Sequence, residues 1–173
     1  MIPQIKRILC AMDLSDNSAY VMRYAINSAK KHGARIIILH VLEPLSPTVN
    51  AITQAYLFEG QANKISEERL AYVKDRINKQ LKTFCEKELE NDTECADIVE
   101  SIELREGFPA EMILRMADEL NCNAIVMGTH GKGFIRNTFL GSTSKRVLRR
   151  TRKPVFIIPL SKEEADIGLS DAD

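Results

Sequence analysis

A glycine-rich segment in the C-terminal part of the chain has the residue types that bind phosphate. Two residues separate Gly128 from Gly131, nine residues follow, and the segment ends in Gly141 and Ser142. A short apolar run precedes it, and a stretch with helical character follows it. Glycine lets a ligand approach the backbone closely and permits φ > 0. The first N–H groups and the dipole of a following helix favour negative charge. This pattern predicts a phosphate-binding loop between a strand and a helix.

Two widespread phosphate loops do not fit this segment. No glycine stands five residues before a Gly-Lys-Ser/Thr sequence, and the dinucleotide pattern G-x-G-x-x-G is absent. The spacing G-x-x-G, nine residues, G-S instead resembles that of the ATP-binding branch of the universal stress protein family. Further blocks in the family's order extend the resemblance over nearly the whole chain; together they comprise residues 8–13, 36–41, 107–110, 124–142 and 153–159.

The resemblance implies an ATP site, with Mg²⁺ held mainly by the phosphates. On the adenosine side it implies contacts from Ala11, Asp13, Val41, Met127 and Gly128. On the phosphate side it implies contacts from Gly131, Gly141, Ser142 and Thr143. Thr129 and Lys132 are also expected among the nucleotide-binding residues. Family members often have proline at the position of Ala11, which is small enough to sit beside an adenine but less rigid.

Asp13 follows the first predicted strand directly. A carboxylate at the carboxyl end of a strand could accept hydrogen bonds from ribose hydroxyls, or reach a magnesium ion on the phosphates. The alternative is that it caps the following helix. Ser15 and Asp16 compete for that capping position, so ligand contact is the favoured interpretation.

The polar side chains around the glycines allow more than one role. Ser142 is expected to bind phosphate and, at the same time, to cap the last helix. His130 lacks a catalytic partner that the sequence identifies, so an exposed or hydrogen-bonding role is favoured over that of a general base. Lys132 and Arg136 either steer phosphates or belong to a solvated loop.

Length and composition indicate which class of protein this chain belongs to. The 173 residues, 45% apolar and 28% charged, are ordinary for a globular protein, and we expect one domain over residues 1–160. The acidic segment 161–173 is expected to be disordered. The four cysteines form no C-x-x-C, which favours free thiols over a metal site. Neither a signal peptide nor an 18-residue apolar run is present, so a cytoplasmic protein without a membrane partner is expected.

The charges are distributed unevenly although their sum is zero. Residues 128–153 contain eight basic and no acidic residues, whereas residues 161–173 contain five acidic residues and one lysine. A basic segment around the glycines suits an anionic ligand. The alternative is a solvated helix face, which is favoured for Arg146, Arg149 and Arg150. Binding of nucleic acid is disfavoured, because no recognition motif is identifiable.

Hydrophobic periodicity predicts five strands that alternate with helices. Strands are expected at residues 5–12, 35–41, 98–104, 124–128 and 155–159. Helices are expected from about residue 16 to Gly33, and at 66–90, 109–121 and 142–150. The linker 43–65 between the second strand and the second helix is predicted to be irregular or to hold a short helix. This alternation indicates a single-domain α/β protein with an open five-stranded parallel sheet and helices on both faces. The resemblance implies a Rossmann-like, adenine nucleotide alpha hydrolase-like fold with strand order 3-2-1-4-5.

Two functions are compatible with these features. The favoured one is that of an ATP-binding regulatory protein of the stress response, whose nucleotide biases a surface that binds an unknown protein partner. The alternative is a slow ATPase or phosphotransferase that uses the same pocket. The resemblance also implies a homodimer formed through the final strand, residues 155–158.

Overall fold

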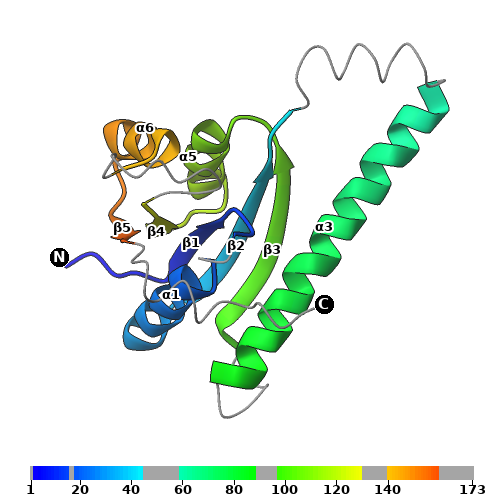
Figure 1. Ribbon diagram of the computed structural model, residues 1–173. Coiled ribbons are helices and arrows are strands. Elements are labelled where there is room, and N and C mark those ends of the chain that lie inside the picture. Colours follow the sequence, from blue (N-terminus) through cyan, green and yellow to red (C-terminus); the bar gives the residue numbers. More distant parts are fainter. Residues whose placement is uncertain (1, 16–17, 45–58, 89–96, 130–139, 160–173) are drawn as a thin grey trace.

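The computed structural model describes residues 2–15, 18–44, 59–88, 97–129 and 140–159. Five parallel strands form one sheet in the order β3-β2-β1-β4-β5 (Figure 1). The fold class and the strand order expected from the sequence are both confirmed. The strands are β1 (Arg7–Met12), β2 (Arg35–Leu42), β3 (Val99–Glu106), β4 (Ala124–Gly128) and β5 (Val155–Ile158).

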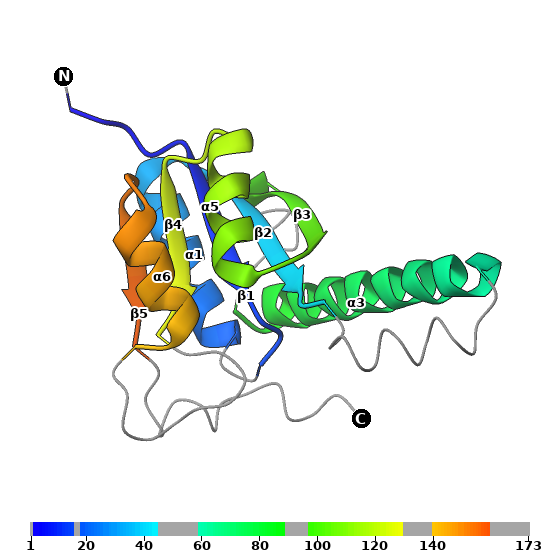
Figure 2. The same ribbon diagram turned by 90° about the horizontal axis from the view of Figure 1, so that it is seen from above.

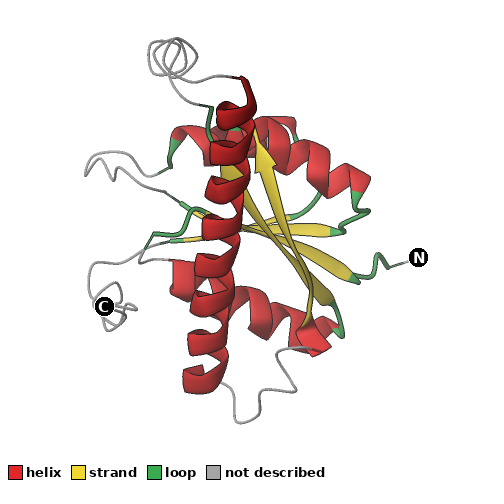
Figure 3. Cartoon of the chain, turned by 90° about the vertical axis from the view of Figure 1, so that its right-hand side faces the viewer, coloured by secondary structure: helices red, strands yellow, loops and turns green. Residues whose placement is uncertain are grey.

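Helices cover both faces of the sheet (Figures 2 and 3). Helices α1 (Ser18–His32) and α3 (Glu59–Glu88) lie on one face, and α5 (Pro109–Glu119) and α6 (Ser142–Arg150) on the other. Successive residues of a strand point to opposite faces. In β1, Ile8 and Cys10 therefore pack toward α1 and α3, whereas Leu9 packs toward α5 and α6. Burial on both faces explains why the central strands are continuously apolar.

The predicted helix boundaries agree with the structure except at the start of α3. Helix α1 ends at His32, where Gly33 takes a φ of 60° that suits glycine. Helix α3 begins at Glu59, seven residues earlier than predicted. The prediction started at the first apolar residues with helical spacing, but the preceding residues include strong helix formers that extend the helix. In Figures 1 and 2 this end of α3 projects beyond the sheet.

Within the described ranges, none of the helices combines the length and the apolar character needed to cross a bilayer.

The expectation of four free thiols is wrong for Cys85. Cys10 and Cys122 are free and buried, but Cys85, near the C-terminal end of α3, is disulfide-bonded. The remaining cysteine, Cys95, lies outside the described residues. The prediction relied on the absence of C-x-x-C, whereas a disulfide requires two Cα atoms within about 7 Å and Cβ atoms that face each other. Distances of that kind arise from the fold and leave no short motif.

Candidate functional site

The carboxyl ends of three neighbouring strands meet at the point where the strand order reverses. Ala11 of β1 lies beside Met127 of β4, and Met12 lies beside His40 of β2. His40 is buried, and its Nδ1 lies 2.8 Å from the carbonyl oxygen of Met12. Because a carbonyl oxygen only accepts, Nδ1 carries the hydrogen of this bond. His40 thus connects the ends of β1 and β2 at the edge where α/β sheets bind ligands.

Asp13 organises the turn that follows β1. Its Oδ1 accepts hydrogen bonds from the Ser15 backbone N–H at 3.1 Å, the Ser15 hydroxyl at 2.7 Å and the Ser18 hydroxyl at 3.3 Å. Between them, Leu14 has a φ of 60°, which is uncommon for a residue with a side chain. The other carboxylate oxygen, Oδ2, is buried and has no hydrogen-bond partner in the described part of the chain. A buried acceptor without a donor is costly, so Oδ2 has the capacity to accept a further hydrogen bond.

The first residues after β4 are connected to α6 and β5 by backbone hydrogen bonds. The Thr129 N–H donates to the Ile158 carbonyl at 3.0 Å, and the Gly141 N–H donates to the Thr129 carbonyl at 2.8 Å. The buried Ser144 hydroxyl lies 3.0 Å from the Gly128 carbonyl oxygen and 3.1 Å from that of Thr129. These contacts hold the end of β4 against the first turn of α6.

The N-terminus of α6 has an open first turn. Gly141 is the N-cap residue, with φ −66° and ψ 165°, and no side chain caps the helix. The expectation that Ser142 caps this helix is therefore wrong, because Ser142 is already its first residue. The N–H groups of Ser142, Thr143 and Ser144 lack partners within the helix, as in any first turn. Since Gly141 does not have φ > 0, what its missing side chain offers is close approach to the backbone.

The structure brings together several of the residues expected to bind ATP. Ala11, Val41 and Met127 pack on the sheet face that α5 and α6 cover. Gly128, Thr129 and Gly141 meet through the hydrogen bonds above. Ser142 is exposed and Thr143 is partly buried. The predicted contacts from Gly131 and Lys132 lie outside the described residues, as do His130 and Arg136.

Two positioning residues were not predicted from the sequence. The His40 ring is hydrogen-bonded to a backbone carbonyl oxygen 28 residues away in the chain. The Ser144 hydroxyl is hydrogen-bonded to backbone carbonyl oxygens 15 and 16 residues away. A buried histidine in an apolar strand was the available signal for the first. The second serine in Ser142-Thr143-Ser144 was the available signal for the second.

Helix α6 and the turn after it carry a strong positive charge. Arg150 pairs with Glu111 at 3.4 Å, and Lys153 pairs with Asp118 at 3.1 Å. Four further cations are exposed and have no ion pair with any described residue: Lys145, Arg146, Arg149 and Arg152. We call these four residues the α6 basic face. Over the same described ranges, no group of three His, Cys, Asp or Glu side chains could hold a metal ion.

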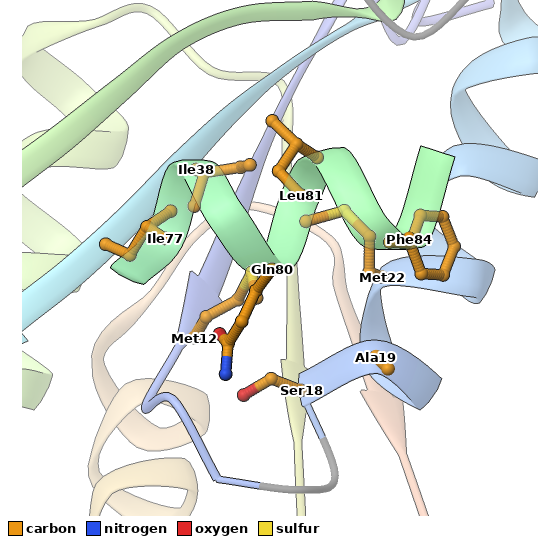
Figure 4. Close-up of a pocket in the computed structure, with 9 residues that line it drawn as sticks. All are labelled: Met12, Ser18, Ala19, Met22, Ile38, Ile77, Gln80, Leu81 and Phe84. Carbon is orange, nitrogen blue, oxygen red and sulfur yellow. The ribbon is translucent and has the colours of Figure 1, made fainter. Parts of the chain in front are cut away.

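A small pocket lies on the opposite face of the sheet, between α1 and α3. Its interior has room for no more than about one water molecule, and its lining is mostly apolar. Gln80 of α3 extends into it between Met12 and Ser18 (Figure 4). The Gln80 Oε1 atom is buried without a hydrogen-bond partner in the described residues. This pocket is separated from the edge formed by Ala11 and Met127, because those side chains pack on the other face.

Burial also determines the pKa values of Cys10 and Cys122, the two free thiols among the described residues. Desolvation raises the pKa of Cys10 to about 12 and that of Cys122 to about 11, where the nearby Lys153 and Arg7 charges oppose the effect. Both thiols therefore stay protonated at neutral pH and are poor nucleophiles.

Comparison with known proteins places this architecture in one family. The model of the universal stress protein family matches residues 4–159. The sequence is 33% identical to a universal stress protein of Thermus aquaticus, over 88% of this chain and 98% of that protein. It is 27% identical to the universal stress protein MJ0577 of Methanocaldococcus jannaschii, over 88% of this chain and 94% of that protein.

Solved structures show the same fold. The structure of MJ0577 superimposes with a TM-score of 0.70 at 20% identity, over 92% of this chain and 99% of that one. A universal stress protein solved in complex with cAMP superimposes with a TM-score of 0.52 at 23% identity, over 92% of this chain and 100% of that one.

Proposed function

The chain belongs to the universal stress protein family, and from that premise we propose that this stress-response protein binds ATP at the switch point of its sheet. Adenosine would lie over the ends of β1, β2 and β4, beside Ala11, Val41 and Met127. Gly128 would also lie on the adenosine side, and the phosphates would lie against the segment from Thr129 to Thr143, which includes Gly131 and Lys132. Mg²⁺ would be held mainly by the phosphates.

The observation that carries this proposal is the buried Oδ2 atom of Asp13. Its partner oxygen already accepts three hydrogen bonds, so the side chain is held in place while Oδ2 is left without a donor. A ribose hydroxyl is a donor of suitable chemistry, and a carboxylate acceptor gives a strong, charge-assisted bond. Asp13 follows β1 directly, next to the strands that carry Val41 and Met127.

The open first turn of α6 supports a phosphate on the other side of the site. Three backbone N–H groups, the helix dipole and the surrounding basic residues all favour an anion there. Ser144 and the Gly141–Thr129 hydrogen bond hold this turn in place without using those N–H groups. The cAMP bound to the related protein described above is also an adenine nucleotide.

Calorimetric titration of the purified chain with ATP, ADP, AMP and adenosine, in the presence of Mg²⁺, tests the proposal. We expect ATP to bind more tightly than adenosine. Gly141→Val should weaken ATP at least tenfold, because a β-branched side chain obstructs the approach of phosphate to the first turn. Adenosine should lose much less affinity. Absence of binding at millimolar ATP would refute the proposal, and single-turnover incubation with labelled ATP would reveal any hydrolysis.

We further propose that two copies pair through β5. Among the described strands, this short apolar strand is at the edge of the sheet and pairs only with β4, and Phe156 is 37% exposed. An unpaired apolar edge is an aggregation hazard that pairing with a second copy removes. Sedimentation at micromolar concentration should show a dimer, and Phe156→Asp should convert it to a monomer. A parent chain that is monomeric under these conditions would refute this assembly.

A further inference from the structure

We propose that the acidic segment 161–173 docks on the α6 basic face of the same chain. The four cations of that face, Lys145, Arg146, Arg149 and Arg152, are exposed and without an ion pair among the described residues. Lys145, Arg146 and Arg149 fall within about 100° of the helix circumference, because each residue advances by that angle. They therefore present a single positive surface.

The charge of segment 161–173 is complementary to this face. It contains Glu163, Glu164, Asp166, Asp171 and Asp173 against one lysine, which leaves a net charge of 1 − 5 = −4. The α6 basic face carries four positive charges that have no ion pair with any described residue. Helix α3 also exposes cations, but there they alternate with acidic side chains such as Glu67, Glu68 and Asp75. No acidic residue occurs anywhere between Gly128 and Lys153, so nothing within that segment neutralises α6.

The described part of the chain ends where the acidic segment can reach this face. Ile158 accepts a hydrogen bond from Thr129, which in turn accepts one from Gly141, the N-cap residue of α6. The end of β5, at Ile158, therefore lies close to the first turn of α6. Glu163 is five residues beyond Ile158 and can lie up to about 17 Å away. Helix α6 has nine residues, or about 13.5 Å. Asp171 is thirteen residues beyond Ile158 and can lie up to about 43 Å away, so the acidic residues together can reach the whole helix.

The docked segment would screen the first turn of α6 from anions in solution. This consequence, unlike the contact itself, rests on the proposed binding of ATP. Neutralising the segment should then raise the affinity for ATP about threefold at low salt. The effect is small because the repulsion between the acidic segment and the ATP phosphates, over roughly 10 Å, is weak in water, and it should disappear as the ionic strength rises. Adenosine, which is uncharged, should bind equally well with either form of the segment.

Backbone amide NMR spectra of the full chain and of the variant E163Q/E164Q/D166N/D171N/D173N test the contact without any nucleotide. At low ionic strength, we expect the amide signals that differ between the two proteins to include residues 142–152. At about 1 M salt, where the Debye length is about 3 Å, those differences should vanish. Unchanged α6 signals at low salt, or changes confined to another surface, would overturn the proposal.

Two charge variants provide the matched controls. K145Q/R146Q/R149Q/R152Q should abolish the effect of neutralising the acidic segment, whereas K6Q/K74Q/R76Q/K79Q removes four exposed cations elsewhere and should preserve it. Differences that grow with protein concentration would place the segment on a second copy and overturn docking within one chain. If neither form binds ATP while the α6 signals still respond, the docking stands and the proposed nucleotide function fails.

Discussion

Replacing Asp13 with asparagine separates the proposed ligand contact from the structural role of this side chain. In Asp13→Asn, the amide oxygen can still accept from Ser15 and Ser18 at the Oδ1 position. The NH₂ group then occupies the Oδ2 position, where it donates and cannot accept from a ribose hydroxyl. Loss of one hydrogen bond to a charged acceptor costs about 1.5–3 kcal/mol, which corresponds to roughly 10- to 150-fold weaker binding.

Calorimetric titration measures this loss, and adenosine should lose as much affinity as ATP because the ribose is common to both. The folded state should be only slightly affected: about 1 kcal/mol less stable, or a melting temperature roughly 2–4 °C lower. Ser15→Ala is the matched control, because it removes the 2.7 Å bond to Oδ1 and leaves Oδ2 intact. It should reduce stability by a similar amount while ATP affinity is retained. Parental ATP affinity in a folded Asp13→Asn protein would refute the role assigned to Oδ2.

Three further predictions follow from buried polar and ionisable groups. Gln80→Met removes the unpartnered Oε1 atom and should stabilise the fold by about 1–3 kcal/mol in urea unfolding; an unchanged stability would mean that water satisfies this atom. Ser144→Ala should cost about 1–3 kcal/mol and weaken ATP binding, because the Gly128 and Thr129 carbonyls lose a buried donor; equal unfolding curves would contradict this. Burial raises the pKa of Cys10 in the folded protein to about 12. Above about pH 9 the thiol of the unfolded chain therefore loses its proton while that of the folded chain keeps it. The free energy of unfolding should then fall as the pH rises toward 12, by up to about 1.4 kcal/mol per pH unit. Melting temperatures between pH 8 and 10.5 should therefore decline less steeply in Cys10→Ala than in the parent, and identical slopes would be the contrary result.

Much of the fold could be predicted from local sequence. The continuous isoleucines of β2 indicate a strand buried on both faces, and Gly33 marks the end of α1 because only glycine readily takes a positive φ there. The start of α3 could not be placed, because its first turns lack the apolar periodicity that identified the rest of the helix. Strand order came from the family resemblance, since periodicity does not specify which strands are neighbours.

The site was less predictable than the fold, because its contacts join residues that are distant in the chain. The bond from His40 to the Met12 carbonyl and those from Ser144 to Gly128 and Thr129 exist only once the strands are assembled. Ser142 was expected to cap α6 because serine is a good N-cap residue. Gly141 is the N-cap instead, because its backbone is extended while its carbonyl oxygen accepts the first hydrogen bond of the helix, from the Lys145 N–H.

Thr129 connects the edge strand β5 to the first turn of α6 through its two backbone hydrogen bonds. Its N–H is bonded to the last residue of the edge strand β5, and its carbonyl accepts from the residue that begins the open turn of α6. A displacement of this residue would move both hydrogen bonds, and so affect the sheet edge and the turn proposed to bind phosphate together. Thermodynamic linkage then requires reciprocity: if nucleotide changes the affinity between two copies by some factor, pairing changes nucleotide affinity by the same factor. In that case, raising the nucleotide concentration would change the fraction of dimer, and raising the protein concentration would change the fraction of protein with bound nucleotide.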